Sequence, residues 1–193
     1  MKIISKSTLL CLGLFGYSQL YAANQITITG RVIDSTCTLS GGDNTDGAYD
    51  DIAVVLDTVL DSAFSGVDSI TATKEFKLRL TKTNSSTACD PVTNQGLKGI
   101  GLSVPANGYV TAKPSVIVNT AYTGTGQVNL QILTNNDIPV TFNTTYPSQP
   151  RSTVIADDGG FATLTYKAQY IAAEATSLAQ PVQASLTYTL EYN

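Results

Sequence analysis

The sequence predicts an all-β protein, because strand-forming residues, alternating patterns and turn clusters recur along the chain after its first two dozen positions. Thr, Val, Ile and Tyr are frequent in short runs, and clusters of Gly, Asn, Asp and Pro separate these runs. β-Branched and aromatic residues favour strands, whereas Gly, Asn, Asp and Pro favour the turns between them. Strand signals at this spacing are typical of an antiparallel sandwich or barrel.

The first 22 residues have the pattern of a secretory signal peptide, in which a positively charged start precedes an apolar run and small residues. Lys2 and Lys6 supply the charge, 9–15 the apolar run, and Ala22 and Ala23 the small residues. Cleavage after either alanine fits, and we favour Ala22 because the residue at position −3 is then Leu instead of Tyr. The run is shorter than the roughly 20 residues that cross a bilayer. The mature form, which starts at residue 23, is therefore expected to have no integral membrane segment.

The charge balance and the lack of histidine narrow the function. The chain has 11 basic and 15 acidic residues, and Lys2 and Lys6 are among the basic ones, so the mature form is acidic. Nucleic acids and anionic membranes attract basic surfaces, so neither is an expected partner. The sequence contains no His, which removes Ser-His and Cys-His nucleophile pairs and His-ligated metals. We therefore expect no enzyme activity, no metal and no cofactor.

Two cysteines, Cys37 and Cys89, remain outside the signal peptide. In an oxidising compartment an isolated pair is more often bridged than free, and two buried unpaired thiols are the alternative. A bridge would close a loop of about 50 residues, which stabilises the folded state by roughly 4 kcal/mol in the chain-entropy model.

Alternation of apolar and polar residues marks the expected strands, since successive side chains of a strand point to opposite faces. The last alternation is the clearest, with apolar residues at every second position from Ala184 to Tyr192. The alternating segments are 25–32, 76–80, 127–133, 161–166 and 184–192, and the turn clusters are 40–51, 94–101, 123–126, 147–151 and 157–160. The stretch 41–75 is harder to assign, because its part 52–68 fits either a short helix over 54–63 or an irregular pair of strands.

The two ends of the mature chain are unusual together. Residues 23–29 form a short alternating apolar strand at a terminus, where order requires a partner. Residues 184–192 form a strongly apolar strand, and an apolar sheet edge is an aggregation hazard unless something covers it. These ends can pair within one molecule or between molecules.

The mature chain resembles the pilin subunits of chaperone–usher fimbriae, such as type 1, P and F17-like pili. Three motifs in this order, together with the penultimate Tyr192 and the Cys37 and Cys89 pair, carry the resemblance. The motifs are Ile26-x-Ile28-x-Gly30-x-Val32-Ile33-x-x-x-Cys37, Phe76-x-Leu78-x-Leu80 ahead of Cys89, and Phe161-x-x-Leu164-x-Tyr166-x-Ala168-x-Tyr170 running on to Ala184-Ser185-Leu186-Thr187-Tyr188-Thr189-Leu190-Glu191-Tyr192-Asn193.

The resemblance implies an incomplete immunoglobulin-like β-sandwich over residues 30–193, with an apolar groove beside its C-terminal strand. A periplasmic chaperone is expected to fill this groove with a strand of its own and to deliver the subunit to an outer-membrane usher. In the fibre, the N-terminal extension 23–29 of a neighbouring pilin subunit takes the place of the chaperone strand. Main-chain hydrogen bonds then give affinity, and alternate apolar side chains fix the register.

The resemblance also assigns roles to single residues. Ile26 and Ile28 are expected to plug the groove of the neighbour, and Gly30 marks where this donor strand meets the body of the subunit. The residues expected to line the groove and contact the chaperone are Leu186, Tyr188, Leu190 and Tyr192, and the carboxylate of Asn193 is expected to bind basic residues of the chaperone.

Two departures from the family pattern concern the path of the chain and the length of the donor strand. Gln180, beside Pro181, stands where the family often has Gly, and the donor strand is only about seven residues long before Gly30.

The predicted function is a structural subunit of an extracellular adhesive fimbria, the major shaft pilin in preference to a minor subunit. The alternative is a secreted, lectin-like binding module of the same sandwich class, in which 23–29 pair within the molecule.

Overall fold

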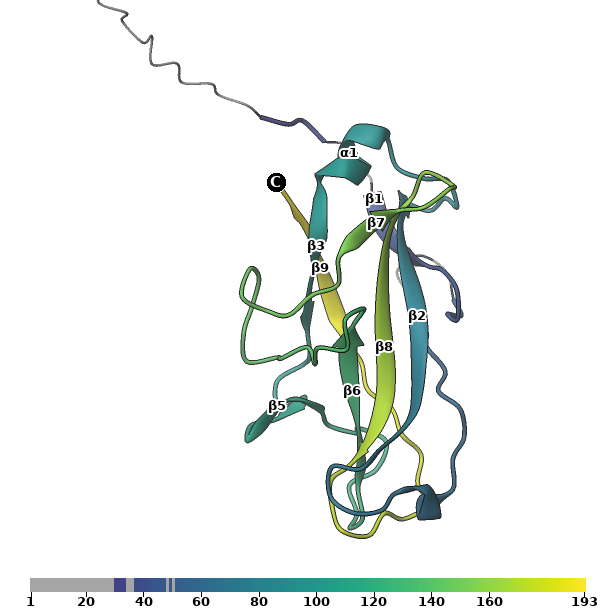
Figure 1. Cartoon of the computed structure of the whole chain (residues 1–193), viewed down its shortest axis with the longest axis vertical. Helices are drawn as coiled ribbons and strands as arrows, with labels where there is room; N and C mark the ends of the chain where they lie inside the picture. The colour runs from purple at the N-terminus through teal and green to yellow at the C-terminus, as the bar shows by residue number, and fades with distance from the viewer. Residues whose placement is uncertain (1–29, 34–36, 48, 50) are drawn as a thin grey trace, which may run out of the picture. The chain divides into compact units, whose positions relative to one another are not determined.

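Nine strands, one short α-helix and one 3-10 turn make up the part of the chain that the structure describes, residues 30–33, 37–47, 49 and 51–193 (Figure 1). The structure is a computed structural model. The predicted signal peptide and the predicted donor strand with Ile26 and Ile28 lie outside the described residues. Arg31–Asn193 forms one compact unit, which we call the body. The elements are β1 (Cys37–Gly41), η1 (Asp61–Ala63), β2 (Ile70–Lys82), α1 (Pro91–Gly96), β3 (Leu97–Ser103), β4 (Tyr109–Val110), β5 (Lys113–Ile117), β6 (Val128–Thr134), β7 (Val154–Ala156), β8 (Ala162–Ala172) and β9 (Thr187–Tyr192).

The larger sheet is antiparallel and runs in the order β1-β2-β8-β6-β5-β4. Its centre is the long pair β2 and β8, in which Phe76 stands opposite Tyr166 and Leu78 opposite Leu164. Both β6 and β7 pair with the other edge of β8, with β7 at the start of that strand and β6 along the rest. The alternating segments that the sequence placed at 76–80, 127–133 and 161–166 all fall within or beside these strands.

The smaller sheet contains only β3 and β9, paired antiparallel from Leu97 opposite Tyr192 to Ser103 opposite Thr187. Among the described strands, none pairs with the second edge of β9. The body is therefore all-β, as predicted, but its second sheet is narrow. None of the described helices has the length and apolarity to span a bilayer.

The core lies between the two sheets and takes side chains from both. Tyr166 is the largest side chain in it that is fully buried, and its ring stacks on that of Phe76 with the centroids 6.2 Å apart. Burial raises the pKa of the Tyr166 phenol, whose oxygen accepts a hydrogen bond from the Ser152 main chain at 3.3 Å. Other core residues with at most 3 % exposure are Leu39, Leu80, Leu97, Ile100, Ile117, Val128, Val140, Ala162, Leu164 and Ala172.

Gln149 covers the outer edge of β3, the edge away from β9. Its side-chain oxygen accepts a hydrogen bond from the Leu102 nitrogen at 2.8 Å, and its Nε2 donates to the Leu102 oxygen, also at 2.8 Å. The same Nε2 donates to the Thr141 oxygen at 2.8 Å. Because Gln149 is buried, one side-chain amide takes the place of a neighbouring strand at this position.

The segment that the sequence left open, 52–68, is neither a helix over 54–63 nor a regular pair of strands. Residues 52–60 are extended, and a helical turn appears only at η1. Ile52, Val54 and Leu56 pack against the core at every second position, while Val55 between them is exposed. This period of two belongs to a strand that covers a sandwich core, and the helical alternative is wrong for that reason.

The predicted disulfide between Cys37 and Cys89 is present, with 6.2 Å between the Cα atoms. It ties the start of β1 to the loop before α1. Asp90 then caps α1, since its side chain accepts hydrogen bonds from the nitrogens of Val92 and Thr93, both at 3.0 Å. Hydrogen bonds from Thr93, and then from Val92, hold the pKa of the Asp90 carboxyl below its usual value.

We expect the Cys37→Ser variant to lose roughly 4 kcal/mol of unfolding free energy, because the open chain regains the entropy that the bridge removes. Urea unfolding of the oxidised protein measures this loss, and the wild type treated with a reductant is the matched control. Equal urea midpoints for the variant and the oxidised wild type would contradict the prediction.

Candidate functional site: an open apolar groove

The feature that sets this body apart is a groove of about 760 Å³ between two extended segments, 51–56 and 182–188. The floor of the groove consists of core side chains from the larger sheet, and Leu102 of β3 borders it. Most of these lining groups are aliphatic or aromatic. The floor residues are Leu39, Phe76, Leu78, Ile117, Leu130, Ile132, Ala168 and Tyr170.

The first wall, 51–56, presents apolar side chains to the groove and an almost unpaired main chain. Asp46 and Ala53 exchange two main-chain hydrogen bonds of 2.8 Å. The Nζ of Lys74 donates to the Val55 oxygen at 2.8 Å. Beyond these, residues 54–59 form no main-chain hydrogen bond with another described residue. Donors and acceptors on this wall are therefore available to a further strand.

The second wall, 182–188, leads into β9 and alternates in the same way. Val182, Ala184, Leu186 and Tyr188 are half-buried on one face, and the residues between them are exposed. The alternation continues to Leu190 and Tyr192, which pack against the core cluster. Since β9 pairs only with β3, its groove-facing edge meets no other described strand. The structure thus brings Leu186 and Tyr188 to the groove and sets Leu190 and Tyr192 beyond it.

Gln180, the departure from the family pattern, holds the chain where it enters the second wall. Its Oε1 accepts a hydrogen bond from the Val128 nitrogen at 2.9 Å, and its Nε2 donates to the Gly126 oxygen at 2.7 Å. Fully buried Asn119 donates from Nδ2 to the Pro181 oxygen at 2.9 Å and accepts from the Gln183 nitrogen at 3.1 Å. Sequence reasoning missed Asn119, whose only signal is a polar residue that closes the apolar run 116–118.

Tyr188 does more than line the groove. Its hydroxyl accepts a hydrogen bond from the Leu39 nitrogen at 3.2 Å and lies 2.9 Å from Oγ1 of Thr38, with either hydroxyl able to donate. Both partners belong to β1, so this side chain reaches from the smaller sheet across to the larger one. The alternating pattern of the sequence gave no sign of this contact.

The two ends of the described body meet beside α1. Arg31 donates from Nη1 to the Val92 oxygen at 3.1 Å, and the Asn193 nitrogen donates to the Gly96 oxygen at 3.2 Å. Gly30 is exposed just before Arg31. Burial raises the pKa of the Tyr192 phenol near this end, and the charge of Asp90 adds to the effect.

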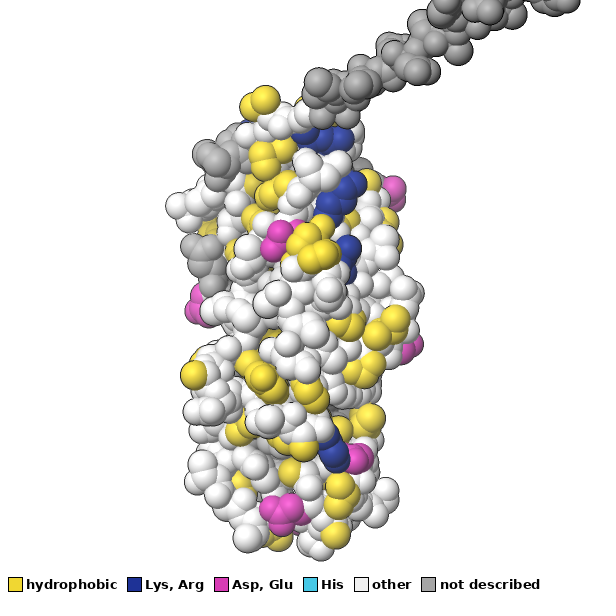
Figure 2. Space-filling model, turned by 90° about the vertical axis from the view of Figure 1, so that its left-hand side faces the viewer, with side chains coloured by type: hydrophobic (Ala, Val, Ile, Leu, Met, Phe, Trp, Pro, Cys, Tyr) yellow, Lys and Arg dark blue, Asp and Glu magenta, His cyan; other side chains and the backbone are white. Residues whose placement is uncertain are grey.

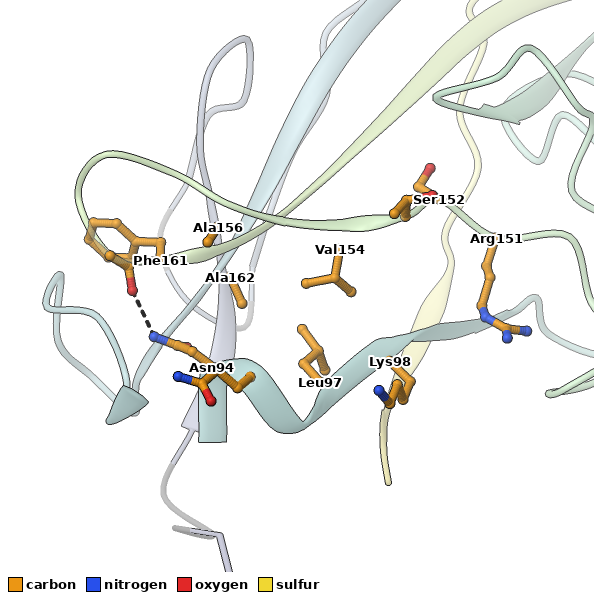
Figure 3. A pocket seen from close by; sticks show the side chains of 12 residues that line it. Asn94, Leu97, Lys98, Arg151, Ser152, Val154, Ala156, Phe161 and Ala162 are labelled. Carbon is orange, nitrogen blue, oxygen red and sulfur yellow. Dashed lines mark hydrogen bonds between the residues drawn. The ribbon is translucent and has the colours of Figure 1, made fainter. Parts of the chain in front are cut away.

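A second cavity, of about 610 Å³, lies between the start of β3 and the β7–β8 turn (Figure 3). Asn94 closes one side of it by donating from Nδ2 to the Gly160 oxygen at 2.8 Å. Arg151 on its rim donates to the Pro147 oxygen at 2.7 Å and stacks over the Tyr146 ring at 4.7 Å. The Ser152 hydroxyl donates to the Thr165 oxygen. These polar groups are engaged in holding loops.

Figure 2 shows the side of the body that lies to the left in Figure 1. Hydrophobic side chains reach the surface at many places on this side, and charged side chains are few.

Comparisons with known proteins bear on the fold. No family model and no curated protein matches the sequence. The solved P pilus rod subunit PapA is 16 % identical with a TM-score of 0.54, over 88 % of this chain and 100 % of that one. A chaperone–usher pilus, solved to explain rod uncoiling, is 15 % identical with a TM-score of 0.54, over 90 % and 97 %. A type I fimbria protein and antigen of Burkholderia pseudomallei is 23 % identical with a TM-score of 0.49, over 81 % and 97 %. This chain therefore has the fold of the chaperone–usher pilins, as its sequence motifs indicated.

We expect Gln180→Ala to lower the free energy of unfolding by about 1–3 kcal/mol, because the Val128 nitrogen and the Gly126 oxygen lose their partner. The matched control is Gln183→Ala, which removes an exposed amide three positions on whose side chain bonds no described residue. Urea unfolding compares the two variants. Equal losses from both would contradict the role given to Gln180.

Proposed function

We propose that this chain is a structural subunit of a surface fimbria, assembled when the groove of one copy receives residues 23–29 of a neighbouring copy. The observation that carries the proposal is the groove itself. Two facing walls, 51–56 and 182–188, turn alternate apolar side chains inward and leave main-chain groups unpaired. An extended segment with apolar residues at every second position satisfies both requirements at once.

The predicted donor strand fits the groove in pattern and in length. Ile26 and Ile28 stand two positions apart, so both side chains of an extended strand point to the same side. The walls are six and seven residues long, and the donor strand 23–29 has seven. Extended at roughly 3.3 Å per residue, seven residues span about 23 Å. A short donor strand is therefore matched by a short groove.

The position of Arg31 favours donation to another copy over pairing within the molecule. Arg31 contacts α1, beside which β9 ends, whereas the groove borders the chain only up to Tyr188. A strand leading back from Arg31 along β9 would pass five residues, or about 17 Å at 3.3 Å each, before it reached Tyr188. Only about three residues of 23–29 would then remain for the groove. This geometry speaks against the self-complete, lectin-like alternative.

The remaining parts of the proposal follow from the fold. An exported subunit with an uncovered apolar groove needs a temporary occupant, which a periplasmic chaperone would supply before an outer-membrane usher accepts the subunit. Leu186 and Tyr188 in the groove, with Leu190 and Tyr192 beyond it, are the side chains such a strand would meet. A shaft role is proposed because PapA, which has the same fold, is described as a rod subunit. The protein acts as a building unit of an extracellular fibre and not as an enzyme.

We expect Ile26→Asp combined with Ile28→Asp to block fibre assembly without blocking export, since each carboxylate would enter an apolar pocket at a cost of several kcal/mol. The matched control is Thr27→Asp with Thr29→Asp, which places the same charges on the opposite face of the strand. Each chain is expressed in a Gram-negative host with a chaperone and an usher, and extracts are run in SDS without boiling. A heat-sensitive ladder is expected from the wild type and the control only.

Two results would overturn the proposal. The first is a normal ladder from the double isoleucine variant. The second is a stable monomer of the wild type that forms without a chaperone and unfolds when residues 23–29 are deleted, because that behaviour belongs to a sandwich completed within one molecule.

A further inference from the structure

We infer that Tyr188 is the stop that ends the groove and sets how far a donor strand can enter. The inference rests on the proposed function, because it concerns the same groove. It assigns to Tyr188 a positioning role that apolar lining alone does not give. The role depends on the hydroxyl, which ties the two sheets together at one end of the opening.

The first observation is where the contact lies. The Leu39 amide donates to the Tyr188 oxygen at 3.2 Å, although β1 pairs with β2 along its whole length. This amide therefore points away from β2, toward the side where the larger sheet is open. Thr38 adds a second contact of 2.9 Å to the same oxygen. The free edge of β1 is thus held at this point by a side chain of β9.

The second observation is where the groove ends. Its lining follows the second wall from Val182 to Tyr188 and goes no further along β9. On β3, its lining includes only Leu102, the residue opposite Tyr188. The next inward residues toward α1, Leu190 and Ile100, pack on the core and do not line the groove. The opening and the hydroxyl bridge therefore end at the same residue.

A strand that passed this point would have to separate the Tyr188 hydroxyl from both of its partners on β1. It would also need the Leu39 amide for its own main chain, since that amide is the donor on the free edge. A strand that stops short leaves these contacts in place and still occupies both walls. The stop therefore limits the donor strand to about the seven residues that 23–29 provide.

The test measures how binding depends on peptide length. The host is the full chain carrying Ile26→Asp and Ile28→Asp, so that its own donor strand does not compete. The probes are a peptide of residues 23–29 and two nine-residue peptides, each with a Thr-Ile pair added at one end. Binding is measured on the wild-type groove, on Tyr188→Phe and on Tyr170→Phe. Tyr170 is the matched control because it lines the same groove and its hydroxyl bonds no described residue.

In the host that keeps Tyr188, and in the Tyr170→Phe control, we expect both longer peptides to bind with affinities within about twofold of the short one. With Tyr188→Phe, we expect one longer peptide to bind at least about tenfold more tightly than the short one. If a longer peptide also bound about tenfold more tightly to the wild-type groove, the inference would be overturned. It would also be overturned if neither longer peptide bound more tightly than the short one to Tyr188→Phe. Failure of the short peptide to bind any of the proteins would overturn the proposed function itself.

A second measurement keeps Tyr188 intact, in case Tyr188→Phe does not fold. Hydrogen exchange of main-chain amides is compared with and without the seven-residue peptide. The stop predicts slower exchange at Val54 and Leu56, whose amides point to the edge opposite that of Ala53 and Val55, and unchanged exchange at Leu39. Slower exchange at Leu39 on peptide binding would show that the strand has displaced the tyrosine, and would overturn the inference.

Discussion

The structure depends on one constraint, which is that a sandwich core must be covered on both sides. The larger sheet covers one side with the long pair β2 and β8. Within the described residues the smaller sheet has only β3 and β9, so the core side chains next to β9 are covered on one flank and open on the other. Apolar area left in water weakens the main driving force for folding. The proposed chaperone strand, and after it the proposed donor strand, would each cover this open flank of the core.

Ion pairs at the surface add little stability to offset the uncovered part of the core. The ion pairs lie at the surface and are at least partly open to solvent, as in the group where Lys77 and Arg79 meet Asp43, and Arg79 also meets Asp157. The hydrogen bond from Lys77 lowers the pKa of the Asp43 carboxyl, yet solvent screens exposed pairs of this kind and they add little to stability. Stability in this protein therefore depends on how fully strands cover the core, and in the proposed fibre assembly completes the fold.

Sequence patterns predicted the parts of the fold that depend on local alternation. The inward row from Ala184 to Tyr192 and the strand around Phe76 could be recognised because side-chain direction follows from position alone. The segment 54–63 could not, since Val and Leu at short spacing suit either period until a core is present to select one. Gln149, Gln180 and the Tyr188 hydroxyl were also beyond reach, because their partners at Leu102, Val128 and Leu39 are distant in sequence.

The amide of Gln149 has a consequence for the form of the assembly. The smaller sheet has two edges, and this side chain occupies the outer edge of β3 at Leu102, which leaves the edge of β9 as the one that can accept a strand. In the proposed fibre each subunit is then a bifunctional monomer, with one donating end and one accepting edge. Polymers built from bifunctional monomers grow as unbranched chains. A single buried side chain thereby helps to decide that the product is a thread and not a network.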